Sequence, residues 1–420
     1  MNATFTNALR YCVTATCVSP LRTGGDINAV LRTEDGAALL QGSSLAGALR
    51  EFSLGQLGKG QTELFFGTQD REGSLIVSDG IFEDAKQKSR PRLRMDGKTG
   101  TGATGGKFDV AHLEVGSQFS FQLIWRGGAD SGAAERQLLL LLSALHSGSI
   151  RLGAQCSNGF GQVSLTVKLQ RYDMCTTRGR NAWQKNTDLG EDLVLTPNRQ
   201  GRVRFTLKAE AESLLIKAAT GSGVGAGSAD AIQMTEGGLP VVPGSSVKGV
   251  LRGQAVKIAQ ALGLDATAVD RCFGCAGTRG NDGLPGQVWF GDARFDKTPQ
   301  KRKITRIHVD RFTGGVIRQG LFTEEPVSGT LTITADAVES PEVCTLLLYA
   351  LRDLGLGLVP LGSGGSVGRG YLKGQRLMVT APDGTESTLV FSPEGGVIME
   401  DTANLFARWR AALGGTQHEA

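Results

Sequence analysis

The stretch LPVVPGSSVKGVLRG, residues Leu239–Gly253, predicts a tight glycine-serine turn that opens a helix. A similar stretch, LLQGSSLAGALRE, occupies Leu39–Glu51, so the two turns begin at Gly42 and Gly244, 202 residues apart. In both copies we expect the serines after the glycine to cap the helix, because serine hydroxyls accept the N–H groups that a first helical turn leaves free. The repeated turn indicates that the chain is internally duplicated.

Further pairs of matching segments recur in the same order along the chain. They are LFFG ending at Gly67 and RCFG ending at Gly274, the aspartates Asp79 and Asp292 after β-rich runs, RLRMDGKTG and RIHVDRFTG around Asp96 and Asp310, and the loops GAQCSNGFG at 153–161 and GSGGSVGRG at 362–370. All offsets lie between 202 and 214 residues. A period of this length is that of a domain and not of a short solenoid repeat.

Each half has the same succession of expected elements: strand, helix, strands, helix, strand. The alternating strands that open the halves are at 9–19 and 201–213, the helices after the glycine-serine turns at 44–57 and 246–262, and the second helices at 133–148 and 341–355. This order is typical of a ferredoxin-like α+β sheet with insertions. We therefore predict domains at 1–170 and 201–380, a linker at 171–200 and a C-terminal tail with a helix at 381–420.

Composition bounds the class of protein. The chain has 420 residues, 60 glycines, a net charge of +4 and seven scattered cysteines. The scattered, odd number of cysteines favours a reduced, cytoplasmic compartment. We expect no secretion signal and no membrane segment, because the longest apolar run, Leu138–Leu145, is too short to cross a bilayer. Cys272 and Cys275 form a C-x-x-C pair, but zinc needs four ligands and no second pair is nearby, so no zinc site is expected.

At these motifs the sequence resembles the RAMP superfamily of CRISPR proteins, in particular the backbone subunits of type III effector complexes. The matching segments are PGSSVKGVLR at Pro243–Arg252, CFG at Cys272–Gly274, HVDRFTG at His308–Gly314 and the loop at 362–370. The first half departs from the pattern, with Gln41 where proline is usual and Ala46 where lysine is usual. Two such units in one chain are similar to the tandem subunit of type III-D systems.

The resemblance implies two tandem ferredoxin-like (RRM-like) domains with thumb hairpin insertions. Its implied partners are guide (CRISPR) RNA, target single-stranded RNA and other type III subunits, including the large polymerase-like subunit, with no membrane partner. It also implies that one acidic residue per unit cuts the target RNA, with Mg²⁺ as the expected cofactor. Two alternatives stay open: a purely structural guide-RNA-binding subunit, and a free-standing RAMP endoribonuclease that processes precursor guide RNA.

The resemblance places the cleaving aspartate shortly before the glycine-serine turn. Asp26 stands 16 residues before Gly42 and Asp230 stands 14 residues before Gly244, each after a glycine-rich stretch. An aspartate can hold Mg²⁺ or accept the proton of a ribose 2′-OH that attacks its own phosphate. The ordinary alternative is a loop aspartate that forms an Asx turn. Rival acidic candidates are Glu34, Asp35 and Glu236.

The turns and glycine loops are the predicted RNA-binding surface. Helix N-termini offer N–H groups to phosphates, and glycines let a backbone approach RNA closely. The predicted contacts are Ser43, Ser44, Arg50, Gly159 and Gly161 in the first half, and Ser245, Ser246, Lys248, Arg252, Gly368, Arg369 and Gly370 in the second. The basic clusters Lys86–Arg94 and Lys301–Arg311 are further candidates for phosphate contacts. Asp96 and Asp310 are interpreted as structural turn residues.

Overall fold

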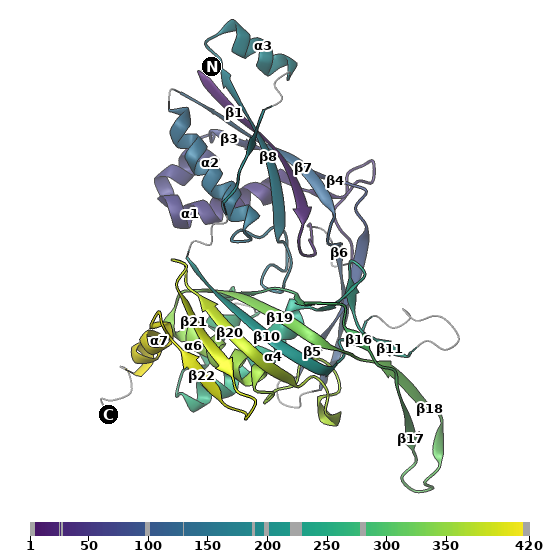
Figure 1. The fold of residues 1–420 in the computed structure, drawn as a ribbon. Coiled ribbons are helices and arrows are strands. Elements are labelled where there is room, and N and C mark those ends of the chain that lie inside the picture. The colour runs from purple at the N-terminus through teal and green to yellow at the C-terminus, as the bar shows by residue number, and fades with distance from the viewer. Residues whose placement is uncertain are drawn as a thin grey trace. The chain divides into compact units, whose positions relative to one another are not determined.

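A computed structural model of the chain divides into two compact units (Figure 1). The structure describes residues 5–24, 26, 28–96, 101–128, 130–186, 190–196, 201–218, 229–277 and 283–414. Unit 1 comprises Met1–Ser89, Asp109–Cys156 and Phe160–Gln200, and unit 2 comprises Arg90–Phe108, Ser157–Gly159 and Gly201–Ala420. Unit 2 therefore includes two segments from the first half of the sequence. The glycine-rich run at 221–227, ahead of Asp230, lies outside the described residues.

Unit 1 is built on an antiparallel sheet with the strand order β2-β4-β7-β1-β8-β9, in which β3 also pairs with β7. Its elements, with the hairpin β5–β6 that extends into unit 2, are β1 (Asn7–Cys17), β2 (Leu39–Leu40), α1 (Gly42–Phe66), β3 (Leu75–Val77), β4 (Gly80–Glu83), β5 (Gln87–Met95), β6 (Gly102–Leu113), β7 (Gln118–Gly127), α2 (Ser131–His146), β8 (Val163–Asp173), α3 (Thr177–Lys185) and β9 (Glu191–Leu193).

The core of unit 1 forms where α1 and α2 cover this sheet (Figure 1). Leu45 and Leu49 of α1 and Leu138 and Leu142 of α2 are fully buried. From Tyr11 to Cys17 the central strand β1 alternates buried and less buried side chains, which is the period-2 pattern of a strand with one face toward the core. Burial of these aliphatic side chains, at roughly 25 cal/mol per Å² of apolar surface, is the main term that stabilises the unit.

Unit 2 has the same plan, with the sheet order β12-β13-β15-β19-β10-β20-β21-β22, in which β14 and β16 also pair with β19. Its remaining elements are β10 (Arg202–Leu214), β11 (Ala231–Ile232), β12 (Thr235–Glu236), β13 (Leu239–Val242), α4 (Gly244–Ala261), α5 (Ala266–Phe273), β14 (Val288–Phe290), β15 (Ala293–Phe295), β16 (Gln300–Lys301), β17 (Ile304–Val309), β18 (Val316–Glu325), β19 (Val327–Val338), α6 (Pro341–Gly355), η1 (Gly365–Val367), β20 (Leu372–Thr380), β21 (Glu386–Phe391), β22 (Val397–Glu400) and α7 (Leu405–Gly414).

The two sheets share one topology. In unit 1 the central strands run β4-β7-β1-β8, and in unit 2 the corresponding strands run β15-β19-β10-β20, all antiparallel. In unit 1 the opening strand β1 lies between β7 and β8, and in unit 2 the opening strand β10 lies between β19 and β20. This is the ferredoxin-like arrangement. The predicted α+β class and the two ferredoxin-like regions are therefore confirmed.

The segments expected to be a linker and a tail contain more structure than the sequence pattern indicated. Within 171–200, α3 follows β8 directly and β9 pairs with β8, so the described part of this segment belongs to unit 1. After Thr380, β21 and β22 extend the sheet of unit 2, and the expected C-terminal helix is α7, whose Trp409 is buried in the core. Among the described residues, every helix is too short or too polar to cross a membrane.

Candidate nucleic-acid interface

A carboxylate caps each glycine-serine turn. The backbone N–H of Gly42 donates to Oδ1 of Asp79 at 2.6 Å, and that of Gly244 donates to Oδ1 of Asp292 at 2.9 Å. Asp79 lies between β3 and β4, and Asp292 between β14 and β15, so each sheet presents its carboxylate to the start of its helix. A negative charge at this position is stabilised by the positive end of the helix dipole.

The serines are not the caps, so this expectation was wrong. The N-cap residues are Gln41 and Pro243, and neither makes a side-chain capping bond. The carboxylate takes the first N–H of the helix, which is one of the groups expected to hold a phosphate. Ser43 and Ser44 remain exposed, whereas Ser245 and Ser246 are half-buried.

In unit 2 the capping aspartate belongs to a buried ion network. Arg90, within β5, donates from Nη2 to Oδ2 of Asp292 at 2.7 Å and to Oε2 of Glu236 at 2.9 Å. All three side chains are almost completely buried. Burial opposes the charge on Arg90, but Asp292 and Glu236 outweigh it and raise the pKa of Arg90 above its usual value. Glu236 is therefore committed to an ion pair, which removes it as a rival to Asp230.

The second glycine-serine turn is covered by Ser157–Gly159, the segment of the first glycine loop that belongs to unit 2. A Cβ on Gly159 would lie 2.6 Å from Oδ1 of Asp292, and a Cβ on Gly244 would lie 2.9 Å from the carbonyl oxygen of Asn158. Gly159, predicted to contact RNA, is therefore buried against protein, and glycine is required there by close packing.

The two basic residues of α4 also have protein partners. Lys248 donates to Oγ of Ser157 at 3.1 Å, and burial together with Arg252 and Arg92 lowers the pKa of Lys248 to about 8. Arg252 pairs with Asp270 at 2.7 Å and also donates to the carbonyl oxygen at the end of α5. Both side chains keep some exposure, so they combine an internal contact with access to a ligand. In unit 1, Arg50 is exposed at the corresponding region of α1.

Two glycines of the predicted loops have a structural role that is the same in both units. A Cβ on Gly161 would lie 2.2 Å from the carbonyl oxygen of Leu152, and a Cβ on Gly370 would lie 2.1 Å from that of Leu361. Both glycines have positive φ, at 88° and 77°. Their conformation and their close packing account for glycine at these positions without a nucleic acid.

At the end of the second glycine loop, an accessible residue, Gly368, is followed directly by a buried one, Arg369. Nothing lies within 4 Å of a Cβ built on Gly368, so this glycine has open space beside it. Its neighbour Arg369 is only 3% exposed and donates from Nη1 to Oε2 of Glu324 at 2.5 Å. The expectation that Arg369 presents its charge to RNA is corrected by this geometry, because its guanidinium is held inside the unit by a buried carboxylate.

The two candidate catalytic aspartates are both exposed, but their hydrogen bonds to the protein differ. Asp230 lies just before β11, and its Oδ2 accepts the backbone N–H of Thr323 at 2.7 Å. The backbone carbonyl of Asp26 accepts hydrogen bonds from Arg22 and from the N–H of Ala29. Asp26 and Asp230 are therefore both at the surface of their units, ahead of the carboxylate-capped turns.

The protein groups around these aspartates do not by themselves form a cage for Mg²⁺. Among the described residues, no group of three or more His, Cys, Asp or Glu is arranged to hold a metal ion. Mg²⁺ requires a near-octahedral shell of oxygens and is often bound by one or two carboxylates together with phosphates and water. The donor set here fits only an ion that takes most of its oxygens from RNA and water.

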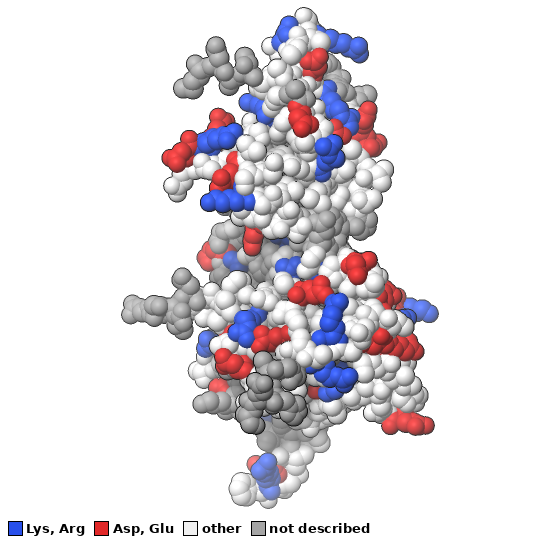
Figure 2. Space-filling model, turned by 90° about the vertical axis from the view of Figure 1, so that its left-hand side faces the viewer, with Lys and Arg blue, Asp and Glu red and all other residues white. Residues whose placement is uncertain are grey.

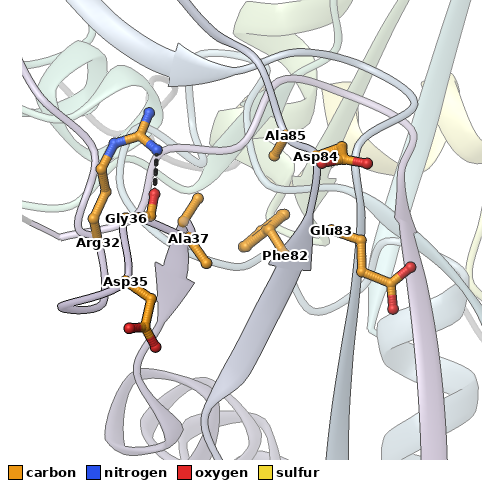
Figure 3. Close-up of a pocket in the computed structure, with 9 residues that line it drawn as sticks. Arg32, Asp35, Gly36, Ala37, Phe82, Glu83, Asp84 and Ala85 are labelled. Atoms are coloured by element: carbon orange, nitrogen blue, oxygen red, sulfur yellow. Dashed lines mark hydrogen bonds between the residues drawn. The ribbon is translucent and has the colours of Figure 1, made fainter.

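The rival candidate Asp35 lies at a pocket of about 570 Å³ in unit 1 (Figure 3). Phe82 lies between the two sides of this pocket, and the carboxylates of Glu83 and Asp84 stand on the side opposite Arg32. Arg32 donates to the carbonyl oxygen of Gly36 at 2.7 Å, which closes the turn that carries Asp35. Glu34, the other rival, is exposed in the same turn, so neither residue is excluded.

The two hairpins expected as thumbs are β5–β6 and β17–β18. In the second, Oδ1 of Asp310 accepts the N–H groups of Phe312 and Thr313 at 2.9 and 2.8 Å, which confirms Asp310 as a turn residue. These bonds lower the pKa of Asp310 below its usual value. Phe312 is fully exposed at the tip. The N–H of Asp96 donates to the carbonyl of Thr101 in the first hairpin, just as the N–H of Asp310 donates to a carbonyl across the tip of the second.

The basic clusters on these hairpins are only partly available. Arg90 is buried in its ion network, and Lys88 pairs with Glu114, whereas Arg94, Arg302 and Lys303 are exposed. On the face drawn in Figure 2, basic and acidic side chains are interspersed, with no continuous stripe of one sign. On this face, contacts to phosphates would therefore depend on individual exposed residues and not on a broad basic field.

Comparison with known proteins places the chain in a family. No curated protein sequence is significantly similar to it. A solved structure, described as "Cryo-EM structure of the Type III-B Cmr-beta bound to cognate target RNA", contains a chain with 16% identity and a TM-score of 0.33. That similarity covers 40% of this chain and 61% of the other, which is less than two thirds of its length. The family model of the RAMP superfamily matches residues 14–164 and 216–373, once in each repeat. The chain therefore belongs to the RAMP superfamily.

Proposed function

We propose that the chain is a backbone subunit of a type III CRISPR RNA-guided effector complex, a tandem fusion as in type III-D systems. In this role it binds guide RNA and cleaves complementary target RNA at two places, one for each RAMP repeat. The observation that carries the proposal is the duplication itself: two RAMP matches, two ferredoxin-like sheets, and an exposed candidate aspartate ahead of each capped turn.

The proposed reaction uses Asp26 in the first repeat and Asp230 in the second. The ribose 2′-oxygen attacks the adjacent phosphorus, the bond from phosphorus to the 5′-oxygen breaks, and the carboxylate accepts the 2′ proton. The leaving 5′-oxygen takes a proton from water. At each site a Mg²⁺ held by the aspartate together with RNA oxygens and water would neutralise charge on the phosphate. Exposure of both carboxylates supports this assignment, since a target strand has to reach them.

For guide RNA, the exposed residues are the better candidates. Ser43, Ser44 and Arg50 in unit 1 and Gly368 in unit 2 are open to a ligand. Lys248 and Arg252 have protein partners, so RNA would add to an existing contact. The alternative, a structural guide-binding subunit without nuclease activity, stays a second candidate, since the described residues do not by themselves supply a metal cage.

The test is cleavage of end-labelled target RNA by the guide-loaded complex, with Mg²⁺ and with EDTA. Wild type is compared with Asp26→Ala, Asp230→Ala and the double variant, and guide binding is measured for each. We expect each single variant to lose one distinct product while guide binding persists. An unchanged pattern in the double variant would reject the assignment and favour the structural subunit. Cleavage that persists in EDTA would assign the aspartates a direct acid–base role.

A further inference from the structure

The carboxylate of Asp230 is fixed by a strand that is distant in sequence. Its Oδ2 accepts the backbone N–H of Thr323, and the strand that starts immediately after it, β11, runs parallel to β18 with Ala231 opposite Glu324. Asp230 is nevertheless exposed. One carboxylate oxygen is thus held by the protein while the side chain stays open to a ligand. The position of β18 therefore determines where this carboxylate lies.

The residue after Thr323 is the buried centre of a cluster of cations. Oε2 of Glu324 accepts a hydrogen bond from Arg369 at 2.5 Å, and Oε1 lies 3.5 Å from Nζ of Lys217. Glu324 is 6% exposed. A buried carboxylate is stable as an ion only with such partners, and removal of one partner leaves an uncompensated charge. Arg369 is the partner that is buried with it.

Arg369 belongs to a loop that is bonded to the body of unit 2. Its N–H donates to the carbonyl oxygen of Gly364, and the N–H of the next residue, Gly370, donates to Ser213 at the end of β10. Among the described residues, the β17–β18 hairpin pairs with β11 and with no strand of the large sheet. A two-stranded ribbon is marginally stable by itself. Glu324 lies at the base of this ribbon, just before β18 continues into β19 of the large sheet. Its pair with Arg369 adds a link from that base, through the glycine loop, to β10.

Unit 1 makes the same junction with different chemistry. In unit 1, Phe160 precedes Gly161 as Arg369 precedes Gly370, and its ring is in contact with that of His112, near the end of the thumb strand β6. These two rings lie 5.5 Å apart, with His112 buried. Both repeats thus place a direct side-chain contact between the thumb strand and the glycine loop. An ion pair is not required by the fold, since the first repeat achieves the junction with rings.

From this geometry we propose that the Glu324–Arg369 ion pair is a positioning element for the second cleavage site. It holds β18 so that the N–H of Thr323 orients the carboxylate of Asp230 toward the RNA. This inference rests on the proposed function, because it needs Asp230 to act on RNA. A displacement of about 1 Å of a reacting group can cost on the order of 100-fold in rate.

The experiment uses the guide-loaded complex under single-turnover conditions, with end-labelled target RNA. The two products give an internal control, because Asp26 is assigned to one and Asp230 to the other. Glu324→Gln and Arg369→Gln are expected to slow the Asp230 product at least tenfold. They should leave the Asp26 product and the target affinity close to wild type. Because each variant leaves a buried charge without its partner, the rates are measured well below the melting temperature of each variant complex. Arg369→Lys keeps the charge and should restore most of the rate.

The matched control is Lys373→Gln, which removes an exposed ion pair with Glu212 from the same unit. It should change neither product. If Asp230→Ala leaves both products intact, the proposed function fails for this site, and the positioning role fails with it. If Asp230→Ala abolishes one product but Glu324→Gln and Arg369→Gln leave its rate within twofold of wild type, the positioning role alone is wrong. Equal loss of both products together with target binding would assign the pair to stability and also overturn the proposal.

Discussion

The carboxylate of Asp292 holds the backbone N–H of Gly244 at 2.9 Å, and through its other oxygen it also holds Arg90. The equivalent Asp79 holds Gly42 in the same way but is exposed. The same aspartate thus caps a helix in both repeats and, in unit 2, also neutralises a buried guanidinium.

Replacement of the two capping aspartates should therefore have unequal effects. Asp79→Ala removes a helix cap, which costs about 1 kcal/mol of unfolding free energy. Asp292→Ala also breaks a buried ion pair, which costs about 3–5 kcal/mol. Differential scanning calorimetry of the purified chain should show the larger drop in melting temperature for Asp292→Ala. Equal drops would mean that Arg90 contributes nothing through Asp292.

Loss of Arg90 should destabilise unit 2 by leaving two buried carboxylates without their cation. Arg90→Met is expected to cost about 3–5 kcal/mol. Adding Glu236→Gln to this variant removes one of the stranded charges and should recover part of that loss. A double-mutant cycle by urea unfolding should give a coupling energy of at least about 1 kcal/mol. Additive effects would show that the pair does not interact in solution.

Guide-RNA affinity should depend on pH through Lys248, whose pKa is about 8 in the folded chain. The unfolded chain keeps this proton to higher pH, so the contribution of Lys248 to unfolding free energy rises with pH between about 8 and the ordinary lysine value. RNA affinity should change in the opposite sense, because the ammonium that attracts a phosphate is lost above pH 8.

Fluorescence anisotropy with labelled guide RNA at pH 7 and pH 9 measures this effect. Lys248→Arg stays charged over the whole range and should flatten the pH dependence. Lys248→Met carries no charge, so its RNA affinity at pH 7 should be nearly as low as the affinity that wild type shows at pH 9. If wild type and Lys248→Arg show the same pH dependence, another group controls it.

The loop glycines should separate into structural and accessible positions. Gly370→Ala places a methyl 2.1 Å from a carbonyl oxygen, so it should destabilise unit 2 by more than the roughly 1–2 kcal/mol that positive φ alone costs a non-glycine residue. Gly368→Ala has the φ cost but open space around it, so it should be milder in calorimetry and should weaken guide RNA binding. A Gly368→Ala variant with unchanged RNA affinity would remove this glycine from the interface.

The duplicated order of elements could be predicted from the sequence, because helices and alternating strands are local patterns that recur in both halves. The carboxylate caps could not, although Asp79 and Asp292 were visible as repeated residues, because a cap of this kind depends on a strand far away in the chain. The expected serine caps followed the usual local preference and were wrong for that reason.

Burial of charge was the other feature that the sequence did not reveal. Arg369 sits in a glycine-rich loop and resembles an RNA contact, yet Glu324 holds it inside the unit. Arg90 lies in a basic run and is nevertheless the least available residue of that run. In each case the partner is more than 40 residues away, so only the folded topology brings the charges together.

Unit 2 takes up Arg90–Phe108 and Ser157–Gly159, and this has a consequence for how the chain can be divided and made. A fragment that starts after residue 200 would lack the cation of its own buried network and the segment that covers its glycine-serine turn. During synthesis both segments leave the ribosome before the rest of unit 2 has been made, so they can reach their folded positions only after residues 201–420 follow. The two RAMP repeats can therefore be separated in the sequence but do not fold independently. If the gene is split between them, the second fragment should fold stably only when the first fragment is supplied in trans.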